Sequence, residues 1–375
     1  MIYLDHAATS FPKPTAVAAG MHAAAKACAG YGRSAHPAAI RASEIVYACR
    51  AELAALFRLP DPNAVAFTMN ATMALNYAID AAVKERAEVC ISAYEHNSVV
   101  RPLVARRSRI DVVLQRPGQT TLEAWEEHIK KRPSCVIVNH VSNAFGFVQP
   151  IEEIGALCQM YQIPLIVDAS QSAGVCDIDI GKIPSCAAIC TAGHKGLLGP
   201  QGTGVLLVTE NLPRHALITG GTGSRSAEYR QPEEVPDLFE SGTHNLPGIA
   251  GLLEGVRLVR DVGPEKIRQR EKELCEQLER RLSEIRGIRL IGVETERPRL
   301  AVVSIVPERM TCELLAEKLA ENDICVRAGL HCAPLAHRTE GTFDSGTVRF
   351  SLGWNNTAEE VKQAADKVKT IMNTF

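Results

Sequence analysis

A lysine set among glycines is the first residue of this sequence that could carry out chemistry. Lys195 lies in the stretch TAGHKGLLGPQGTG, residues 191–204, directly after the apolar run 186–190. Because glycines let the backbone approach a ligand closely, the pattern predicts a binding turn at the end of a strand. A lysine there can grip phosphate, form a Schiff base with a carbonyl, or be an ordinary lysine of a turn. His194 and Gly196 flank Lys195, so the Gly-Lys-Ser/Thr core of the phosphate-loop motif is absent.

Two more polar residues follow strands that we predict to lie in the same sheet. Asn143 ends the stretch VIVNHVSN (136–143), and Asp168 lies in PLIVDAS (164–170), with an amphipathic helix predicted between them at 151–161. Short apolar strands that alternate with such helices are typical of a buried parallel sheet. Ligands of these sheets bind beyond the carboxyl ends of the strands. We therefore expect Asn143, Asp168 and Lys195 to converge on one site.

Thr72 and His96 follow two further predicted strands, 65–67 and 89–93. Thr72 lies in the first turn of a predicted helix, where free backbone N–H groups and the helix dipole favour an anion. The alternative for Thr72 is a simple N-cap, and the same alternative applies to Asp168 in the turn that follows it. His96 could stack on a flat ligand, or it could only satisfy the hydrogen bonds of its loop.

Together these residue types match what pyridoxal 5'-phosphate (PLP) requires of a protein. A lysine must hold the cofactor through a Schiff base, and a carboxylate must keep its pyridine nitrogen protonated. An imidazole or aromatic face stacks on the ring, and the phosphate takes a helix N-terminus with hydroxyl groups. Lys195, Asp168, His96 and Thr72 provide this set. The sequence therefore predicts PLP chemistry rather than phosphate-loop chemistry.

The predicted elements divide the chain into two domains. Residues 13–257 contain the alternating strands and helices, which indicate a large α/β domain with a mainly parallel sheet between helices. From residue 258 the pattern changes, and 258–375 are expected to form a smaller α+β domain to which residues 1–12 cross back. Its predicted elements are a helix at 264–286, strands at 300–306, 324–326 and 347–351, and helices at 311–322 and from Thr357.

Composition and charge limit the classes of function. Of 375 residues, 46% are hydrophobic and 22% charged, and the formal net charge of −2 gives no argument for a nucleic-acid or anionic-membrane ligand. No apolar run approaches the ~20 residues of a membrane span. The start, MIYLDHAATSFPKP, lacks the pattern of a secretory signal, so a cytoplasmic protein is expected. None of the 12 cysteines forms a C-x-x-C pair, so no metal site is predicted and the thiols are expected to be reduced.

Eight motifs spread over the whole chain resemble those of class V aminotransferase-fold enzymes. Among these enzymes the match is closest to the cysteine desulfurases, in particular the group with a short loop around an R-x-G-x-H-C-A signature. The motifs occur in the family's order: YLDHAAT near the start, EHNS (95–98), HVSN (140–143), VDASQSAG (167–174), GHKGLLGPQGTG (193–204), SGTHN (241–245), RAGLHCAP (327–334) and TVRFSLGWNNT (347–357). The resemblance implies a homodimer of PLP-dependent transferase fold type I, whose large domain has a mainly parallel seven-stranded sheet.

The resemblance also implies a role for each site residue. On the cofactor ring, Lys195 would be the Schiff-base lysine, Asp168 would pair with the pyridine nitrogen, and His96 would stack on the ring and carry protons. Gln171 would contact the ring oxygen, and Asn143 would lie near the ring oxygen and the substrate. The phosphate would be held by Thr72, His194 and a second subunit's Thr243. Arg349 would bind the substrate carboxylate as a bidentate fork. The alternative for Arg349 is a surface arginine on a strand edge.

Cys332 would be the thiolate that attacks the sulfur of L-cysteine, which leaves L-alanine and a persulfide for delivery to a sulfur-acceptor protein. Its surroundings support this role independently, because Cys332 lies in a polar segment with Arg327 and His331 nearby to favour the thiolate. The alternative, which we expect for most of the other cysteines, is a buried thiol that behaves as a small hydrophobe.

Two departures from the family pattern remove hydroxyl groups from the expected phosphate site. Ala71 stands where many relatives have a threonine, and Ala192 where a serine often precedes Gly-His-Lys. Leu330 replaces a histidine that is common beside the nucleophile. Other functions on the same fold therefore stay open: a selenocysteine lyase, a transaminase or another class V lyase, and a non-catalytic sulfur carrier.

Overall fold

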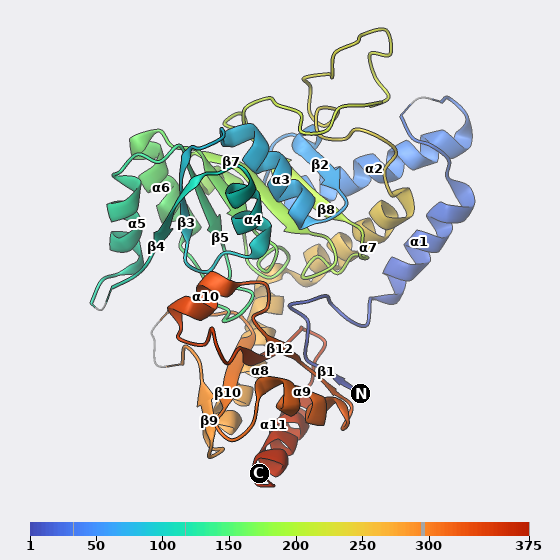
Figure 1. Cartoon of the computed structure of the whole chain (residues 1–375). Helices are drawn as coiled ribbons and strands as arrows, with labels where there is room; N and C mark the ends of the chain where they lie inside the picture. The colour runs from blue at the N-terminus through green and yellow to red at the C-terminus, as the bar shows by residue number, and fades with distance from the viewer. Residues whose placement is uncertain (33, 117, 294–296, 375) are drawn as a thin grey trace.

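The computed structural model describes residues 1–32, 34–116, 118–293 and 297–374, and these form a large and a small part (Figure 1). The large part is built on one sheet with the strand order β2 (Val65–Thr68), β8 (Gly204–Val208), β7 (Cys186–Ala192), β6 (Leu165–Asp168), β5 (Cys135–Asn139), β3 (Glu88–Ser92) and β4 (Arg109–Val113). β8 is antiparallel to both of its neighbours, and the remaining neighbours are parallel. The mainly parallel seven-stranded sheet is therefore confirmed.

Helices cover both faces of this sheet, and the alternation of strand residues explains why. Val136 and Val138 of β5 pack into one core, whereas Cys135 and Ile137 pack into a core on the opposite face. Because both faces are apolar, both must be covered. The first core includes α2 (Pro37–Leu56), α5 (Thr121–Ile129), α6 (Ile151–Tyr161) and α7 (Leu246–Val262), with α1 (Thr15–Ala27) packed along α7; the second includes α3 (Ala71–Ala82) and α4 (Asn97–Ala105).

The helices that follow β2 and β3 begin at the same edge of the sheet, and their cap residues fix where they start. Asn70 caps α3 by accepting a hydrogen bond from the Met73 N–H at 2.9 Å. His96 caps α4 by accepting one from the Ser98 N–H at 3.0 Å. The alternative in which Thr72 is the N-cap of its helix is therefore wrong. Both helix N-termini open toward the carboxyl edge of the sheet.

The small part is a four-stranded antiparallel sheet backed by helices. Its strand order is β12 (Arg327–Gly329), β13 (Thr347–Ser351), β10 (Val302–Pro307) and β9 (Ile288–Leu290), and it is covered by α8 (Pro264–Ser283), α9 (Cys312–Ala320) and α11 (Ala358–Met372). The short helix α10 (Pro334–Thr339) follows β12. β1 (Ile2–Tyr3) pairs with β11 (Ile324–Cys325), so the first residues of the chain lie in the small part.

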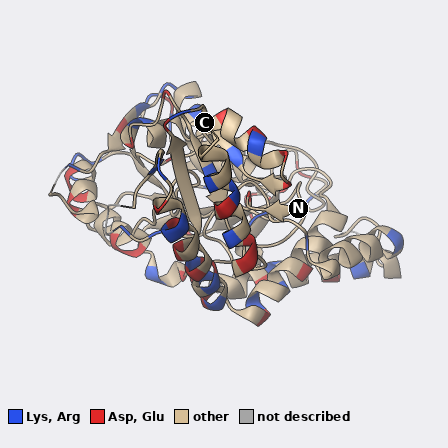
Figure 2. Ribbon diagram, turned by 90° about the horizontal axis from the view of Figure 1, so that it is seen from below, with Lys and Arg blue, Asp and Glu red and all other residues tan. Residues whose placement is uncertain are grey.

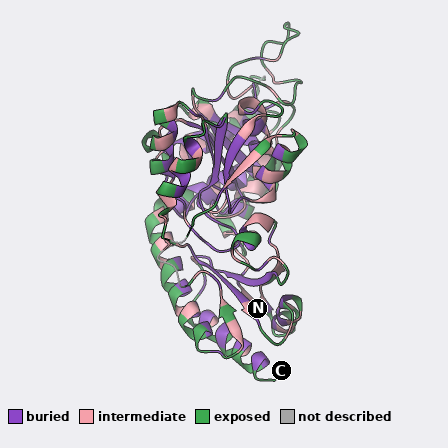
Figure 3. Cartoon of the chain, turned by 60° about the vertical axis from the view of Figure 1, so that its left-hand side comes forward, coloured by how far each residue is buried: buried purple, intermediate pink, exposed green. Residues whose placement is uncertain are grey.

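The helix α8 connects the two parts. Ile267 packs in a core of the large part, whereas Leu274, two turns later, packs in the core of the small part. We keep the domain boundary near residue 258 as a prediction, and the change from one core to the other takes place along α8. Figure 3 shows the buried residues gathered in both sheets and on the inner sides of the helices.

Several elements differ at their ends from the predicted ranges. β5 ends at Asn139 rather than at Asn143, because its neighbours β3 and β6 end at Ser92 and Asp168 and leave no strand to pair with. Residues 140–143 therefore form a loop at the carboxyl edge. β10 begins at Val302 instead of residue 300, and α8 ends at Ser283 instead of residue 286.

The surface carries both signs of charge. Figure 2 shows lysine and arginine interspersed with aspartate and glutamate along the helices, in agreement with the net charge of −2. Within the described part of the chain, no helix has the length and apolar character that crossing a membrane requires.

Candidate active site

One cavity of about 220 Å³ lies at the carboxyl edge of the large sheet and is lined by residues of both parts. Nine of the ten predicted site residues line it: Thr72, His96, Asn143, Asp168, Gln171, His194, Lys195, Cys332 and Arg349. Residues that are distant in the sequence thus converge on one place. The tenth residue, Thr243, lies elsewhere.

Lys195 and Asp168 both line this cavity. Asp168 is 5% exposed, and its Oδ1 accepts hydrogen bonds from the Ser170 N–H (2.9 Å) and the Ser170 hydroxyl (2.5 Å), so the carboxylate caps a turn and not a helix. Burial lowers the pKa of Lys195 to about 8, although the Asp168 charge acts in the opposite direction. A large fraction of the Lys195 amine is therefore neutral near pH 8, and the neutral amine is the nucleophilic form.

The loop that carries Lys195 is held by close backbone contacts. A Cβ atom on Gly196 would lie 2.4 Å from the Ala173 carbonyl oxygen, so a larger residue does not fit. On the other side, the His194 carbonyl oxygen accepts hydrogen bonds from the Ser10 N–H (3.0 Å) and the Lys13 ammonium (2.7 Å). The sequence predicts that the glycines of this loop make room for a ligand. At Gly196, the absence of a side chain instead allows the loop to pack closely against the backbone at Ala173.

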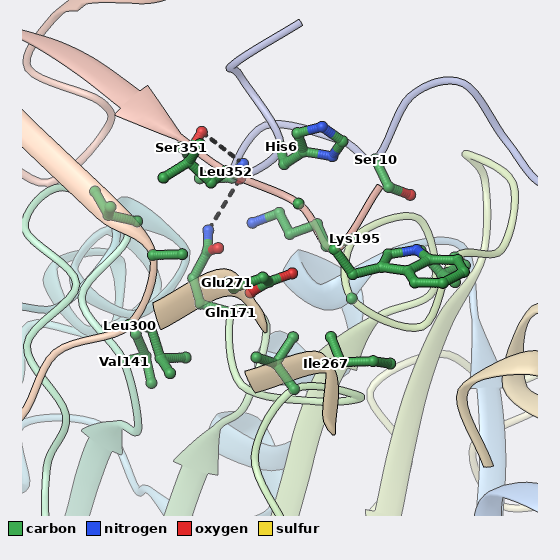
Figure 4. Close-up of a pocket in the computed structure, with 18 residues that line it drawn as sticks. His6, Ser10, Val141, Gln171, Lys195, Ile267, Glu271, Leu300, Ser351 and Leu352 are labelled. Atoms are coloured by element: carbon green, nitrogen blue, oxygen red, sulfur yellow. Dashed lines mark hydrogen bonds between the residues drawn. The ribbon is translucent and has the colours of Figure 1, made fainter. Parts of the chain in front are cut away.

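A second, smaller cavity of about 50 Å³ adjoins the first, and Lys195 and Gln171 line both (Figure 4). The Gln171 side chain donates from Nε2 to the Ala7 carbonyl oxygen at 3.0 Å. Glu271 of α8 and His6 also line this second cavity. Burial raises the pKa of Glu271 to about 8 and lowers the pKa of His6 to about 4, so both side chains are neutral near pH 7.

His96 and Thr72 lie close together although their helices follow different strands. The Ser98 hydroxyl oxygen is 2.5 Å from His96 Nδ1 and 3.1 Å from the Thr72 hydroxyl. Because Nδ1 accepts the Ser98 N–H, the neutral ring carries its proton on Nε2. Burial lowers the pKa of His96; the Asp168 charge acts in the opposite direction, and the Lys195 charge adds to the lowering. His96 is therefore a neutral imidazole at physiological pH.

Four buried polar atoms of the cavity residues have no hydrogen-bond partner among the described residues. They are Nδ1 of His194, Oδ1 of Asn143, Nδ1 of His331 and Nε of Arg349. Buried polar atoms are nearly always paired in proteins, so such atoms indicate places where a ligand supplies the partner. Burial, with the charges of Lys195 and Lys13, lowers the pKa of His194 to about 4, so its ring is neutral.

Arg349 is the most deeply buried charged group of the cavity, with 1% of its surface exposed. It lies on β13, between β12 and β10, so the alternative of a surface arginine on a strand edge is wrong. Its guanidinium donates to the Asn143 carbonyl oxygen at 3.0 Å and to Asp5 Oδ1 at 2.5 Å. Sequence reasoning missed Asp5, although it lies in the YLDHAAT motif.

Cys332 is the one exposed cysteine of the twelve, all of which the structure describes. Its loop is held on both sides: the Cys332 carbonyl accepts from the Asn97 N–H at 2.8 Å, and the His331 carbonyl accepts from Asn143 Nδ2 at 2.6 Å. The alternative of a buried, inert thiol is therefore wrong for Cys332. The sulfur lies where both the cavity and solvent can reach it.

One expectation about this loop needs correction. His331 is buried, its Nε2 lies 3.0 Å from the Thr347 hydroxyl, and burial lowers its pKa to about 2. His331 is therefore uncharged at neutral pH and cannot favour the Cys332 thiolate through positive charge. Arg327 lines the cavity and keeps its side chain exposed, so it is the cation that remains for this role.

Thr243 is exposed and lies in a separate hollow that Phe67, Met73 and Phe239 also line. It does not reach the Lys195 cavity of its own chain. Its expected contact with the cofactor phosphate of a second subunit stays a prediction.

Glu95 is a buried residue next to His96 that sequence reasoning did not single out. It is 0% exposed, and its Oε1 accepts hydrogen bonds from the Ser92 hydroxyl (2.6 Å) and the Asn139 N–H (2.7 Å). Burial raises the pKa of Glu95 to about 8, so it is a neutral acid at pH 7. Glu95 is the first residue of the EHNS motif, but the motif predicted a role only for its histidine.

This arrangement of fold and site has counterparts in known proteins. The family model described as aminotransferase class-V matches residues 2–364, so the chain belongs to the class-V aminotransferase family.

Its relatives within this family include proteins named as cysteine desulfurases. A probable cysteine desulfurase of Synechocystis is 31% identical, and the match covers 100% of this chain and 92% of the relative. A probable cysteine desulfurase of Mycolicibacterium paratuberculosis is 30% identical, but the match covers 96% of this chain and 54% of the relative. This chain therefore spans about half the length of the second protein.

Solved structures show the same fold. An apo structure of a cysteine desulfurase from Thermococcus onnurineus has a TM-score of 0.91 at 27% identity, with 100% of this chain and 95% of that chain covered. A cysteine desulfurase from Escherichia coli has a TM-score of 0.87 at 22% identity, with 100% and 95% covered, and shows the likeness of fold alone.

Proposed function

We propose that this protein is a PLP-dependent cysteine desulfurase that converts L-cysteine to L-alanine and takes the sulfur on Cys332 as a persulfide. One observation carries the proposal: Lys195, Asp168 and Arg349 line the same cavity as the one exposed cysteine of the chain. The named relatives support the same reaction.

The side chains of the cavity fit PLP. When bound, PLP supplies an electron sink for bonds at the substrate carbons. Lys195 would hold it through its amine, Asp168 would pair with the ring nitrogen, and His96 would lie against the ring. Gln171 and Asn143 would face the ring oxygen, and Thr72 and His194 the phosphate. The unpaired Nδ1 of His194 and Oδ1 of Asn143 are the atoms that such a ligand would satisfy.

Arg349 is placed to bind the substrate carboxylate. The guanidinium is buried, which lowers its pKa, and Asp5 already offsets part of its charge. A second carboxylate from the substrate would add charge-assisted hydrogen bonds to a guanidinium that is itself buried. The Asn143 carbonyl holds one guanidinium nitrogen and so fixes the orientation of the fork.

Cys332 performs the sulfur transfer in this proposal. Its thiolate attacks the sulfur of the bound cysteine, the S–S bond forms, and the C–S bond breaks with its electron pair left on carbon. The carbon then takes up a proton, so that cysteine and the thiol become alanine and Cys332 persulfide. Since Cys332 is exposed, we propose that an acceptor thiol then takes the outer sulfur and restores the Cys332 thiol.

The test is the reaction catalysed by the purified protein. With PLP and L-cysteine we expect the yellow absorbance of lysine-bound PLP and the release of L-alanine. A keto acid in place of alanine would indicate a transaminase, and the absence of any yellow band after PLP is added would indicate a sulfur carrier without turnover. Alanine from selenocysteine but not from cysteine would indicate a selenocysteine lyase.

We also propose that the protein acts as a homodimer. Thr243 shares its hollow with Met69 and Ile218, apolar side chains that are 60% and 40% exposed in one chain. A partner subunit would cover these side chains and bring Thr243 to the partner's phosphate site. Sedimentation should give twice the mass of one chain, and Thr243→Ala should weaken PLP binding about tenfold in the intact dimer. A monomer that binds PLP equally well with and without Thr243 would refute this proposal.

A further inference from the structure

Ser98 is a buried serine, 7% exposed, that lies between two of the expected cofactor contacts. It is the second residue of α4 and lines the Lys195 cavity. Its hydroxyl oxygen lies 2.5 Å from Nδ1 of His96 and 3.1 Å from the Thr72 hydroxyl. Ser98 therefore connects the N-terminus of α3, which carries Thr72, to the imidazole of His96.

The hydrogen bonds of this connection fix where its protons lie. The Ser98 N–H donates to Nδ1 of His96 at 3.0 Å, so Nδ1 offers a lone pair and Nε2 carries the ring proton. The Ser98 hydroxyl lies close to the same lone pair and donates to it. The Ser98 oxygen is then left to accept a hydrogen bond from Thr72.

Among the described residues, the Ser98 hydroxyl bonds no backbone group of α4, although one of its two partners, His96, is the N-cap of that helix. Serine at a helix start often bonds a backbone group of that helix. Among the described residues, however, the hydrogen bonds of the Ser98 hydroxyl are those to His96 and Thr72. Its contacts therefore indicate a role toward the site.

The surrounding wall is poor in hydroxyl groups. Ala71 and Ala192 line the same cavity and have no polar side-chain atom, so Thr72 is the hydroxyl left at the start of α3. Thr72 has a single hydroxyl proton, which it can donate either to Ser98 or to an anion at the helix N-terminus. When an anion takes this proton, the Ser98 hydroxyl turns from His96 and donates to the Thr72 oxygen, whereas the Ser98 N–H stays on Nδ1 of His96.

We propose that Ser98 is a positioning residue whose hydroxyl couples the phosphate end of the cofactor site to the hydrogen bonding and orientation of His96. This inference rests on the proposed function, because it takes the anion to be the phosphate of PLP. Ser98 orients the Thr72 hydroxyl before the phosphate arrives. Once the phosphate is bound, the Ser98 hydroxyl supports Thr72, and the Ser98 N–H still keeps the Nε2 proton of His96 directed away from α4.

Binding measurements on cofactor-stripped protein test this coupling. PLP, and pyridoxal as the probe without a phosphate, are titrated into the unmodified protein, Ser98→Ala, Ser98→Thr and the control Ser43→Ala. The Ser43 hydroxyl donates to the Ala39 carbonyl of α2 at 3.1 Å, and Ser43 does not line the cavity. We expect Ser98→Ala to raise the Kd for PLP about tenfold and the Kd for pyridoxal by less than about twofold. Ser98→Thr and Ser43→Ala should both bind PLP within about twofold of the unmodified protein.

Nitrogen-15 NMR of the histidines gives the readout that a purely structural role would not move. In the unmodified protein we expect His96 to carry its proton on Nε2, with the Nδ1 signal shifted by its hydrogen bonds. Ser98→Ala should move the Nδ1 signal, and Ser98→Thr should restore it. If Ser98→Ala does not fold, a proton on Nδ1 of His96 in the unmodified protein would by itself overturn the inference.

The outcomes separate this inference from the proposed function. Wild-type PLP affinity and unchanged His96 signals in Ser98→Ala would refute the coupling while leaving the desulfurase proposal intact. Failure of the unmodified protein to bind PLP at all would overturn both.

Discussion

At the scale of single residues, His331 and Cys332 adopt φ angles of +49° and +57°, in the left-handed region. For residues with a side chain this conformation costs about 1–2 kcal/mol each. It persists because the Asn97 N–H and the Asn143 amide hold the carbonyls of both residues. The same backbone path leaves Cys332 exposed while Ala333 and His331 on either side are buried.

This strain leads to a prediction for stability that is independent of activity. Cys332→Gly should raise the free energy of unfolding by about 1 kcal/mol, because glycine adopts a φ of +57° without a steric penalty. Cys332→Ala keeps the penalty and should change stability by less than about 0.5 kcal/mol. Urea unfolding of both variants measures the difference. A Gly variant that is no more stable than the Ala variant would show that the loop is not strained.

From residue types and their spacing, the chemistry of this cavity is easier to predict than the contacts between its side chains. Nine predicted residues line one cavity, because each follows a strand or lies in a motif that is visible in the sequence. The partners that orient them are less visible. Asp5 reaches Arg349 only because the start of the chain returns to the small part. Nothing in the sequence distinguishes Ser98 or Ser170 from other serines that begin a helix or lie in a turn.

At the scale of elements, sequence patterns predict some helices closely and miss others. α6 is predicted at 151–161 and found there, because its apolar residues recur at helical spacing and two strands flank it. α7 has no such signal, since glycines at 248, 251 and 255 are typical of loops. A Cβ atom on Gly255 would lie 2.5 Å from the Leu197 carbonyl oxygen, so these glycines let α7 pack against the loop that carries Lys195.

The helix α8 carries a buried acid with a consequence for stability. The pKa of Glu271 is raised from an ordinary value near 4.5 to about 8 by burial, so between these pH values the folded protein holds a proton that the unfolded chain releases. The contribution of Glu271 to stability therefore falls as pH rises from 4.5 to 8. The loss approaches about 1.4 kcal/mol for each pH unit within this window.

Glu271→Gln should remove this dependence. Relative to the unmodified protein, we expect the variant to gain stability steadily as pH is raised from 5 to 8, as measured by urea unfolding at several pH values. Glu273→Gln, at an exposed position of the same helix, is the matched control and should show no such trend. Parallel pH curves for the Glu271→Gln and unmodified proteins would mean that Glu271 is charged in the folded state.

At the scale of the whole molecule, the site exists only because both parts of the chain meet. The large part contributes Lys195 and Asp168 at strand ends, and the small part contributes Arg349 and Cys332. The periodicity of the sequence predicts the parallel sheet and the edge at which its ligand lies. It does not predict how the small part is placed against that edge, because this depends on the packing along α8 and on the pairing of β1 with β11.

The most direct test of the account is where the sulfur goes in a single turnover. The PLP-loaded protein is mixed with L-cysteine, quenched by alkylation, digested and mapped by mass spectrometry while L-alanine is counted. We predict one additional sulfur atom on the peptide that carries Cys332, and alanine in equal amount. Cys332→Ala should form neither, whereas Cys28→Ala, which removes a half-buried cysteine, should form both. Alanine released at the unmodified rate by Cys332→Ala, or a persulfide found on another cysteine, would contradict the account.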